Sequence, residues 1–300
     1  MKKTSFKIVA IAMLLVMATV GLVGCGNSNN NNNDPSTPNT SPINVITRED
    51  GSGTRSGFVE LFEVQITGSD GKLIDGIKTS AVTTNSTAVM LTSVSSDKNA
   101  IGYISLGSLN DTVKAVSIGG VAATAANVKN NSYKYSRPFI IATKGSPNDA
   151  TQDFINYIMS SQGQKVVTDN GYIAINESAA SYSRNSSANG RVVINGSSSV
   201  TPVMEKLKEA YALVNSSVTI QINQTDSSTG MTSTIDGICD IGMSSRALKD
   251  SETAAGLNGT QIATDGIAVI VNTSNSVNNL SQEQVKEIFS GEVSRWNEVS

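Results

Sequence analysis

Short β-branched runs alternate along the chain with segments of helical periodicity. Six runs have the composition of strands: INVIT (43–47), AIGYIS (100–105), RPFIIAT (137–143), RVVIN (191–195), VTIQI (218–222) and IAVIVN (267–272). Helical patterns lie in DATQDFINYIMSSQGQKVV (149–167), PVMEKLKEAYALV (202–214) and LSQEQVKEIFSG (280–291). This alternation of strands and helices predicts an α/β architecture.

Polar residues mark the starts of two of these helices and the division of the chain. Thr201 stands where an N-cap belongs, and Pro202 suits the first helical turn. Ser281 with Gln284 three residues later matches a capping box. The stretch NESAASYSRNSSANG (176–190) is Ser-rich and poor in apolar residues, which predicts an exposed connector between two unequal parts.

The first residues follow a different pattern, typical of a leader. Lys2, Lys3 and Lys7 precede an apolar run that is too short and too one-sidedly flanked for a membrane span. The run ends in LVGC (22–25), which resembles a bacterial lipobox. We therefore expect a lipoprotein signal peptide over 1–24 and lipidation of the Cys25 thiol, with an ordinary signal peptide and a chance cysteine as the alternative.

A polar tract follows Cys25. Residues 26–42 include an Asn run and prolines and offer nothing to bury, so residues 25–42 are expected to form a lipidated cysteine and a disordered tether. The mature chain would then be anchored at the extracytoplasmic face of the bacterial cell membrane.

Composition narrows the possible chemistry. The formal net charge is −3, and removal of the three lysines in 1–24 would bring it to about −6, with no basic patch, so nucleic acid is not an expected partner. The sequence contains no histidine, which excludes Ser-His-Asp and Cys-His catalysis and histidine metal sites. We expect no metal and no cofactor. If Cys25 carries a lipid, Cys239 has no disulfide partner and is expected to be a buried small apolar residue.

Four turns rich in Ser, Gly and Thr follow strands: REDGSGT (48–54), NGSSSVTP (195–202), TDSSTGM (225–231) and GMSSR (242–246). The first three lead into expected helices, whose N-terminal N–H groups favour negative charge. Several such turns converging with Arg48 would bind a small oxyanion without a metal. Taken singly, each turn could equally be a plain cap. No Walker pattern occurs, so nucleotide hydrolysis has no support.

These stretches resemble the PstS family, the phosphate-binding proteins of ABC transporters. The resemblance lies in GSSSVTPVMEKLKEAY, DSSTGM, CDIGMSSR, DGIAVIVN, NLSQEQVKEIFSGEVSRWNEV, VITREDGSGTRSGF, KNAIGYISLGSL and RPFIIATKGS, and it covers nearly all of 43–300. The order differs, because the family's GSSSVTP-like segment comes first and its DGSGT-like loop follows the tryptophan segment. We therefore expect a circular permutation joined through the connector, with a truncated tandem array as the alternative.

The resemblance implies a fold and a set of ligands. It implies a two-lobed periplasmic-binding-protein-like (type 2) α/β fold with a ligand cleft between lobes 43–136 plus 275–300 and 137–274. The implied phosphate contacts are Arg48, Ser52, Gly53, Thr54, Ser198, Ser199, Val200, Thr201, Ser227 and Ser245, with Asp50 as the acid that pairs with Arg48. Ser245 stands where the best-known members have an aspartate.

The implied function is a lipid-anchored receptor, not an enzyme, which captures inorganic phosphate and delivers it to the permease subunits of an ABC transporter, as a monomer. Two binding alternatives stay open: a receptor for another tetrahedral oxyanion such as sulfate, or a sensor that works without a permease. A serine hydrolase using Ser52 or Ser198 is a third, and the absence of histidine weighs against it.

Overall fold

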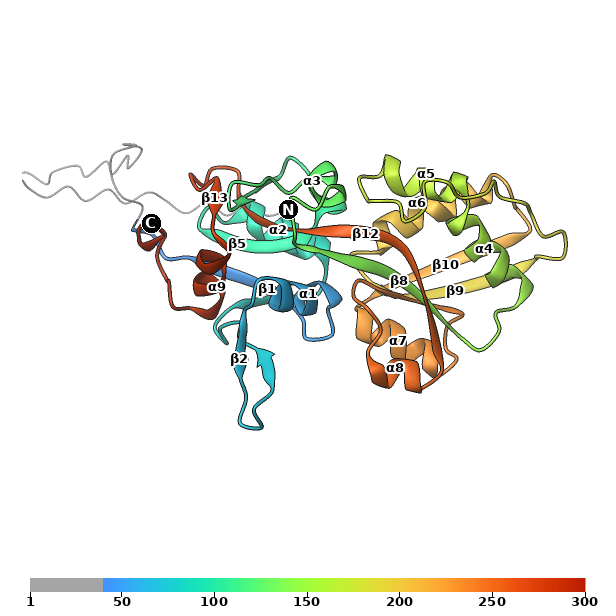
Figure 1. Cartoon of the computed structure of the whole chain (residues 1–300), viewed down its shortest axis with the longest axis horizontal. Helices are drawn as coiled ribbons and strands as arrows, with labels where there is room; N and C mark the ends of the chain where they lie inside the picture. Colours follow the sequence, from blue (N-terminus) through green and yellow to red (C-terminus); the bar gives the residue numbers. More distant parts are fainter. Residues whose placement is uncertain (1–39, 300) are drawn as a thin grey trace, which may run out of the picture. The chain divides into compact units, whose positions relative to one another are not determined.

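The computed structural model describes residues 40–299. Its main sheet has nine strands in the order β10-β9-β11-β8-β12-β5-β1-β4, with β6 paired to β12 (Figure 1). The strands are β1 (Asn44–Arg48), β4 (Val82–Thr84), β5 (Ala100–Ser105), β6 (Val113–Ala115), β8 (Ser136–Lys144), β9 (Gly190–Ser197), β10 (Val218–Thr225), β11 (Ile241–Ser244) and β12 (Leu257–Asn272). Two small sheets pair β2 (Gln65–Thr67) with β3 (Leu73–Asp75) and β7 (Ser117–Ile118) with β13 (Asn279–Leu280).

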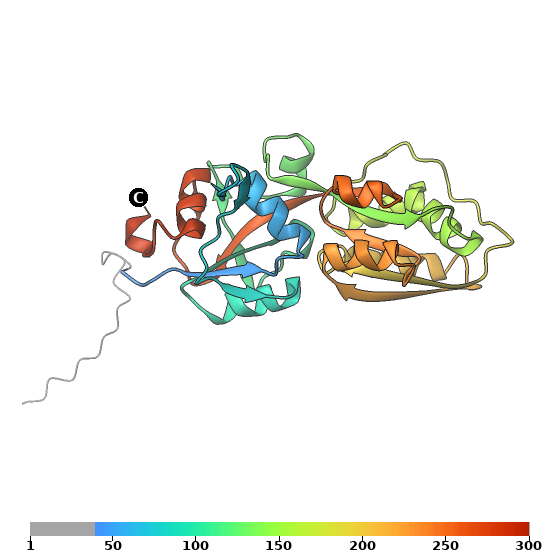
Figure 2. The same ribbon diagram turned by 90° about the horizontal axis from the view of Figure 1, so that it is seen from below.

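Helices cover both faces of the sheet (Figure 2). They are α1 (Gly53–Leu61), α2 (Thr87–Ser96), α3 (Ala125–Lys129), α4 (Asp149–Met159), α5 (Ser161–Asp169), α6 (Thr201–Ala212), α7 (Ser227–Ile235), α8 (Asp250–Ala254) and α9 (Gln282–Ser290), with 3₁₀ turns η1 (Leu106–Ser108) and η2 (Trp296–Glu298). The predicted α/β architecture is therefore confirmed.

Two main hydrophobic cores divide these elements into two lobes. Buried apolar residues of 43–133 and 267–296 form the first core, and those of 139–263 form the second. We call these the first and the second lobe. Strands β8 and β12 are antiparallel partners and carry the chain between the lobes (Figure 1). The α/β pattern of the sequence thus yields two sheet halves joined by a pair of long strands.

The six strands expected from the sequence are all present. The longest, β12, begins already at Leu257, because the polar stretch before Ile267 also pairs with β8, with a bulge between Gln261 and Ala263. The expected helix over 149–167 is broken at Ser160, whose side chain caps α5. The capping box of Ser281 and Gln284 is confirmed.

The ends of the described chain lie side by side. Trp296 N–H donates to the Ser41 carbonyl over 3.1 Å, and Arg295 Nη1 donates to the Thr40 carbonyl over 2.9 Å. Pro42 forms a bridge with Arg295. The predicted disordered tether therefore extends too far toward the C-terminus, because residues 40–42 pair with Arg295 and Trp296. Cys25 and the predicted leader lie outside the described residues.

Among residues 40–299, no helix is both long and apolar enough to cross a bilayer.

Candidate functional site

The four Ser/Gly/Thr turns lie at the carboxyl ends of parallel strands. Strand β9 runs parallel to β10 and β11 in the second lobe, and β1 runs parallel to β4 and β5 in the first. Loops that follow parallel strands gather at one edge of a sheet, where α/β proteins bind their ligands. The facing edges of the two lobes therefore bring loops from both to one place (Figures 1 and 2).

Arg48 is the last residue of β1 and is buried. Its Nη2 donates to Ser198 Oγ of the other lobe over 3.0 Å, and its Nη1 lies 3.5 Å from Thr87 Oγ1. Glu49 accepts two further bonds, from Nε at 2.7 Å and from Nη2 at 2.6 Å. This bidentate pair fixes the plane of the guanidinium at the boundary of the lobes.

The expected pairing of Asp50 with Arg48 is wrong. The side chain of Asp50 is 95% exposed and lies 2.8 Å from Arg55 Nη1. Arg55 also pairs with Asp75 at 2.6 Å and donates to the Arg48 carbonyl over 2.7 Å. Asp50 turns toward Arg55 on the first turn of α1, so Glu49 is left as the carboxylate of Arg48. Arg55 in turn ties the REDGSGT turn to the β2–β3 hairpin.

The rest of this turn begins α1. Ser52 is buried, but its hydroxyl is the N-cap and accepts the Arg55 N–H. Thr54 Oγ1 lies 2.7 Å from Ser199 Oγ across the lobe boundary. A Cβ on Gly53 would lie 2.5 Å from Ser227 Oγ and 2.7 Å from Ser245 Oγ. Glycine at 53 therefore lets the two lobes approach at backbone distance.

The second lobe contributes three turns. Ser198, Ser199 and Val200 are buried between β9 and α6. Ser227 is the first residue of α7, and its Oγ accepts the Ser245 N–H over 3.1 Å. Thr201 points elsewhere, since its hydroxyl donates to the Ser197 carbonyl over 3.0 Å and Val200, not Thr201, is the N-cap of α6. The side chains brought together are thus Ser198, Ser199, Ser227 and Ser245.

Thr87 completes the group and was missed by the sequence analysis. It is the first residue of α2, it is buried, and its N–H donates to Ser198 Oγ over 3.3 Å. Its hydroxyl lies 3.3 Å from Ser199 Oγ. The signal was the NST triplet (85–87) ahead of a helical pattern, which capping rules could have identified. We refer to Arg48, Thr54, Thr87, Ser198, Ser199, Ser227 and Ser245 as the hydroxyl cluster.

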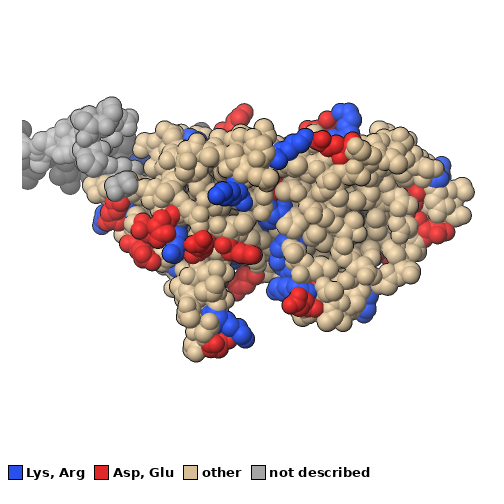
Figure 3. Space-filling view, viewed as in Figure 1, with Lys and Arg blue, Asp and Glu red and all other residues tan. Residues whose placement is uncertain are grey.

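Two further arginines border the hydroxyl cluster. Arg137 Nη1 donates to the Ser245 carbonyl over 2.7 Å, and Arg137 pairs with Asp265 at 3.2 Å. Burial lowers the pKa of Arg137, and burial raises the pKa of Asp265 to about 6 in spite of this pairing. Arg246 forms a bidentate pair with Glu252 at 2.8 and 2.7 Å. Figure 3 shows basic side chains along the boundary of the two lobes.

This arrangement suits a small anion. The cluster offers hydroxyls, one guanidinium and the N-termini of helices α1, α2, α6 and α7, all of which favour negative charge. Ser199, Ser227 and Ser245 have no exposed surface. An ion could therefore reach them only if the lobes moved apart, as they do in the hinge opening and closure by which two-lobed proteins enclose ligands.

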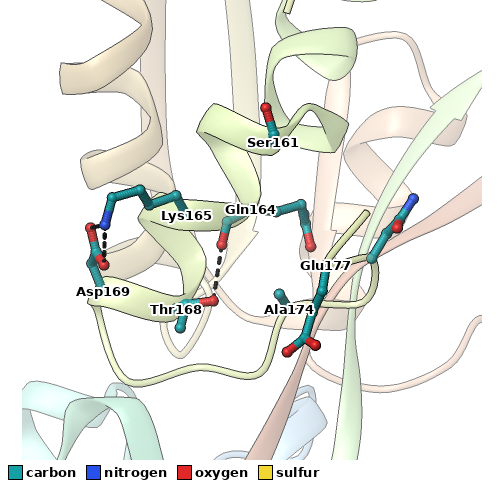
Figure 4. A pocket seen from close by; sticks show the side chains of 8 residues that line it. Ser161, Gln164, Lys165, Thr168, Asp169, Ala174 and Glu177 are labelled. Atoms are coloured by element: carbon teal, nitrogen blue, oxygen red, sulfur yellow. Dashed lines mark hydrogen bonds and ion pairs between the residues drawn. The ribbon is translucent and has the colours of Figure 1, made fainter. Parts of the chain in front are cut away.

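A second hollow is chemically different. A pocket of about 250 Å³ beside α5 is lined by Ser161, Gln164, Lys165, Thr168, Asp169, Ala174, Asn176 and Glu177 (Figure 4). Lys165 is paired with Asp169 at 2.8 Å, and Glu177 is paired with Lys129. It shares no residue with the hydroxyl cluster and is poorly suited to an anion.

The chain is similar to known proteins over most of its length. A family model described as the PBP superfamily domain matches residues 17–162 and 183–300. The chain is 52% identical over 289 residues to the phosphate-binding protein PstS 2 of Streptococcus agalactiae serotype V, covering 96% of this chain and 98% of that protein.

A crystal structure and a more distant relative extend the comparison. The crystal structure of a phosphate ABC transporter's phosphate-binding protein from Streptococcus pneumoniae TIGR4 has a TM-score of 0.68 and 42% identity, covering 87% of this chain and 100% of that one. The phosphate-binding protein PstS of Staphylococcus saprophyticus is 36% identical over 118 residues only, 37% of each chain.

Proposed function

This chain belongs to the PstS family of phosphate-binding proteins within the PBP superfamily, and from that membership we propose that the hydroxyl cluster is its phosphate site. The chain is the extracellular phosphate-binding component of an ABC transporter, and not an enzyme. The periplasmic-binding-protein-like fold expected from the sequence is confirmed. What the proposal adds is the set of residues that hold the ion.

The observation that carries this assignment is the bond between Arg48 of the first lobe and Ser198 of the second. It brings the one guanidinium of the hydroxyl cluster to its hydroxyls, in a place enclosed by both lobes. The backbone N–H groups of Gly53 and Thr54 lie at the start of α1 beside it. Those of Thr87, Ser199 and Val200 are also at helix starts, but they donate to Ser198 Oγ, Ser197 Oγ and the Ser197 carbonyl. Phosphate oxygens would receive charge-assisted bonds from Arg48 and hydrogen bonds from the N–H groups of Gly53 and Thr54.

Titration calorimetry on the soluble chain that starts at Gly26 tests the proposal, after removal of carried-over anion. We expect one phosphate per chain, with binding lost when Ser199 and Thr54 are both changed to Ala. Thr92→Ala, which removes an exposed hydroxyl of α2 bonded to the Ala88 carbonyl, is the matched control. Equal phosphate binding by the double variant would overturn this choice of residues and leave the family assignment in place.

Selectivity against sulfate is the second point of the proposal. The hydroxyl cluster contains Ser245 where the family's best-known members carry an aspartate, so neutral hydroxyls are the acceptors for the proton of phosphate. Such acceptors favour phosphate less strongly than a carboxylate does. We propose that phosphate is still preferred. Competition calorimetry with both anions decides, and equal affinity would favour a general oxyanion receptor.

Anchoring belongs to the proposal as well. LVGC ahead of an Asn-rich tract supports lipidation of Cys25, and the receptor would deliver phosphate to a permease as a membrane-tethered monomer. Cys25→Ala should move the protein from the membrane fraction to the medium or leave an unprocessed precursor. Cys239→Ala is the control, because Cys239 is buried in the described fold. Unchanged mass and fractionation of the Cys25 variant would contradict the prediction.

We also propose that the order of the family segments in this chain is a circular permutation. The chain aligns end to end with PstS 2 of S. agalactiae, but with PstS of S. saprophyticus over only 37% of each. A match confined to part of both chains is what a circular permutation between two groups of the family would give. The truncated tandem array is disfavoured, because each family segment occurs once.

A further inference from the structure

Gly51 lies in the turn between β1 and α1 and contacts the opposite lobe. Its carbonyl accepts a hydrogen bond of 3.2 Å from the N–H of Ser228, the second residue of α7. N–H groups of the first helical turn have no partner within their own helix. The first lobe therefore supplies an acceptor that α7 of the second lobe lacks.

There is no room for a side chain at this position. A Cβ on Gly51 would lie 2.3 Å from Asp226 Oδ1 and 2.6 Å from Asp226 Cγ. The Asp226 carboxylate is not free to swing away, because it caps α7. Its Oδ1 accepts the Thr229 N–H over 2.9 Å, and its Oδ2 accepts the Thr229 hydroxyl over 2.6 Å.

The cause of this requirement lies across the lobe boundary. Gly51 is not in the left-handed region of backbone conformation, so its own turn would accept an alanine. The three atoms nearest to such a Cβ all belong to Asp226, which lies in the other lobe. A methyl group at 51 is therefore tolerated while the lobes are apart and obstructs them when they meet.

We propose that Gly51 is a positioning residue for lobe closure, and that any side chain there keeps the phosphate site from closing. This inference rests on the proposed phosphate-binding function. It is distinct from the role of Gly53, whose N–H belongs to the site itself. Gly51 contacts Asp226 and Ser228, and its replacement leaves every side chain of the hydroxyl cluster in place.

The expected size of the effect follows from the population of the closed state. If binding requires closure, the apparent dissociation constant rises as the closed fraction falls, so a tenfold loss of that fraction weakens binding about tenfold. Since closure retains a bound ligand, the change should appear mainly in the dissociation rate.

Five proteins make the test: the parent chain, Gly51→Ala, Asp226→Ala, the double variant, and Gly68→Ala as the control. Gly68 also lacks a left-handed backbone, and its near neighbours all lie within its own hairpin. Calorimetry with inorganic phosphate measures the dissociation constant, and stopped-flow mixing measures the rate of phosphate dissociation. Small-angle X-ray scattering with and without phosphate measures how far the protein compacts on binding.

We expect Gly51→Ala to unfold at the parent's temperature without phosphate, to bind at least about tenfold more weakly and to show no compaction. Gly68→Ala should behave as the parent. The double variant should bind as Asp226→Ala alone does, because removal of the carboxylate clears the space for the methyl group.

Three results would overturn the inference while leaving the phosphate function intact. They are normal compaction of Gly51→Ala with phosphate affinity within about twofold of the parent, failure of Gly51→Ala to fold, and a double variant that stays weaker than Asp226→Ala. If the parent itself neither binds phosphate nor compacts, the proposed function fails and the closure inference fails with it.

Discussion

Arg48 is fixed by contacts from several elements before any ligand is considered. Glu49 holds two of its nitrogens, while Ser198 and Thr87 approach from the second lobe and from α2. A guanidinium so fixed loses little further freedom on binding an oxyanion, because its planar fork is already oriented.

Arg48→Ala should therefore weaken phosphate binding by at least about tenfold, since a hydrogen bond to a charged group is worth about 1.5–3 kcal/mol. Arg48→Lys should recover little of the loss, because an ammonium cannot reproduce the bidentate contact with Glu49. Asp50→Asn is the matched control, as Asp50 is exposed and paired with Arg55. Calorimetry measures all three, and binding by Arg48→Ala within about twofold of the parent would remove Arg48 from the site.

In the proposed site, Ser245 would accept the proton of phosphate. It is buried within the hydroxyl cluster, and its Oγ lies 3.4 Å from Ser227 Oγ. Ser245→Asp should widen the preference for phosphate over sulfate by at least about tenfold, because sulfate leaves a buried acceptor unpaired at a cost of about 1–3 kcal/mol. Ser245→Asn has the same shape without the charge and is the control. An equal widening by the asparagine variant would show that charge is not the cause.

The positions of some candidate site residues were predictable where a sequence motif marks the start of a helix. Gly53 and Ser227 precede or begin helices in recognisable turns, and both lie where expected. The partner of Arg48 was not predictable, because Glu49 and Asp50 are adjacent acids and only the direction of each side chain separates them. Thr87 was missed because its contacts with Ser198 and Ser199 join positions far apart in the sequence.

At the scale of elements, a buried ion pair joins the two strands that connect the lobes, β8 and β12. Arg137 and Asp265 are register partners on these strands. Ser105 and Gly107 also donate to the Asp265 carboxylate. The desolvation of Asp265 nevertheless dominates and raises its pKa to about 6.

The free energy of unfolding should depend on pH accordingly. An unfolded aspartate titrates near 3.8, so the folded protein keeps the Asp265 proton to a higher pH than the unfolded chain does. Between about pH 4 and pH 6 the parent should therefore lose stability relative to Asp265→Asn as pH rises, by at most about 3 kcal/mol. Urea unfolding across this range measures the effect, with Asp111→Asn as an exposed control. Parallel profiles for the parent and Asp265→Asn would contradict it.

Elements were predicted well where the apolar pattern is strong. The strands at 100–105 and 191–195 place isoleucine or valine at buried positions, and both are found. The early part of β12 was not predicted, because 257–261 (LNGTQ) lacks an alternating apolar pattern. Pairing with β8 holds it as a strand. The break at Ser160 was missed because its hydroxyl competes as a cap within a continuous helical pattern.

At the scale of the whole molecule, the two ends of the described chain are neighbours. Thr40 and Ser41 bond to Arg295 and Trp296, while residues 177–189 of the connector have neither helix nor strand. Near termini and an exposed loop are the conditions under which a chain can be reopened elsewhere without loss of its fold. The hydroxyl cluster depends on which loops meet in space, and chain order does not change that.

A rearranged chain should therefore bind phosphate. It would begin at Ala179, run through β9 to Val299, continue by a short Gly/Ser linker into Ile43, and end at Ser178. The new break separates two residues outside any helix or strand, and the linker joins ends that already lie side by side. We expect phosphate affinity within about threefold of the parent, since every strand pair and every helix start of the site is retained. Opening the chain instead between Gly53 and Thr54 is the control, because that cut lies at the start of α1 and should abolish binding. Circular dichroism and phosphate calorimetry compare the three proteins, and a folded rearranged chain without phosphate binding would mean that the present chain order is itself required by the site.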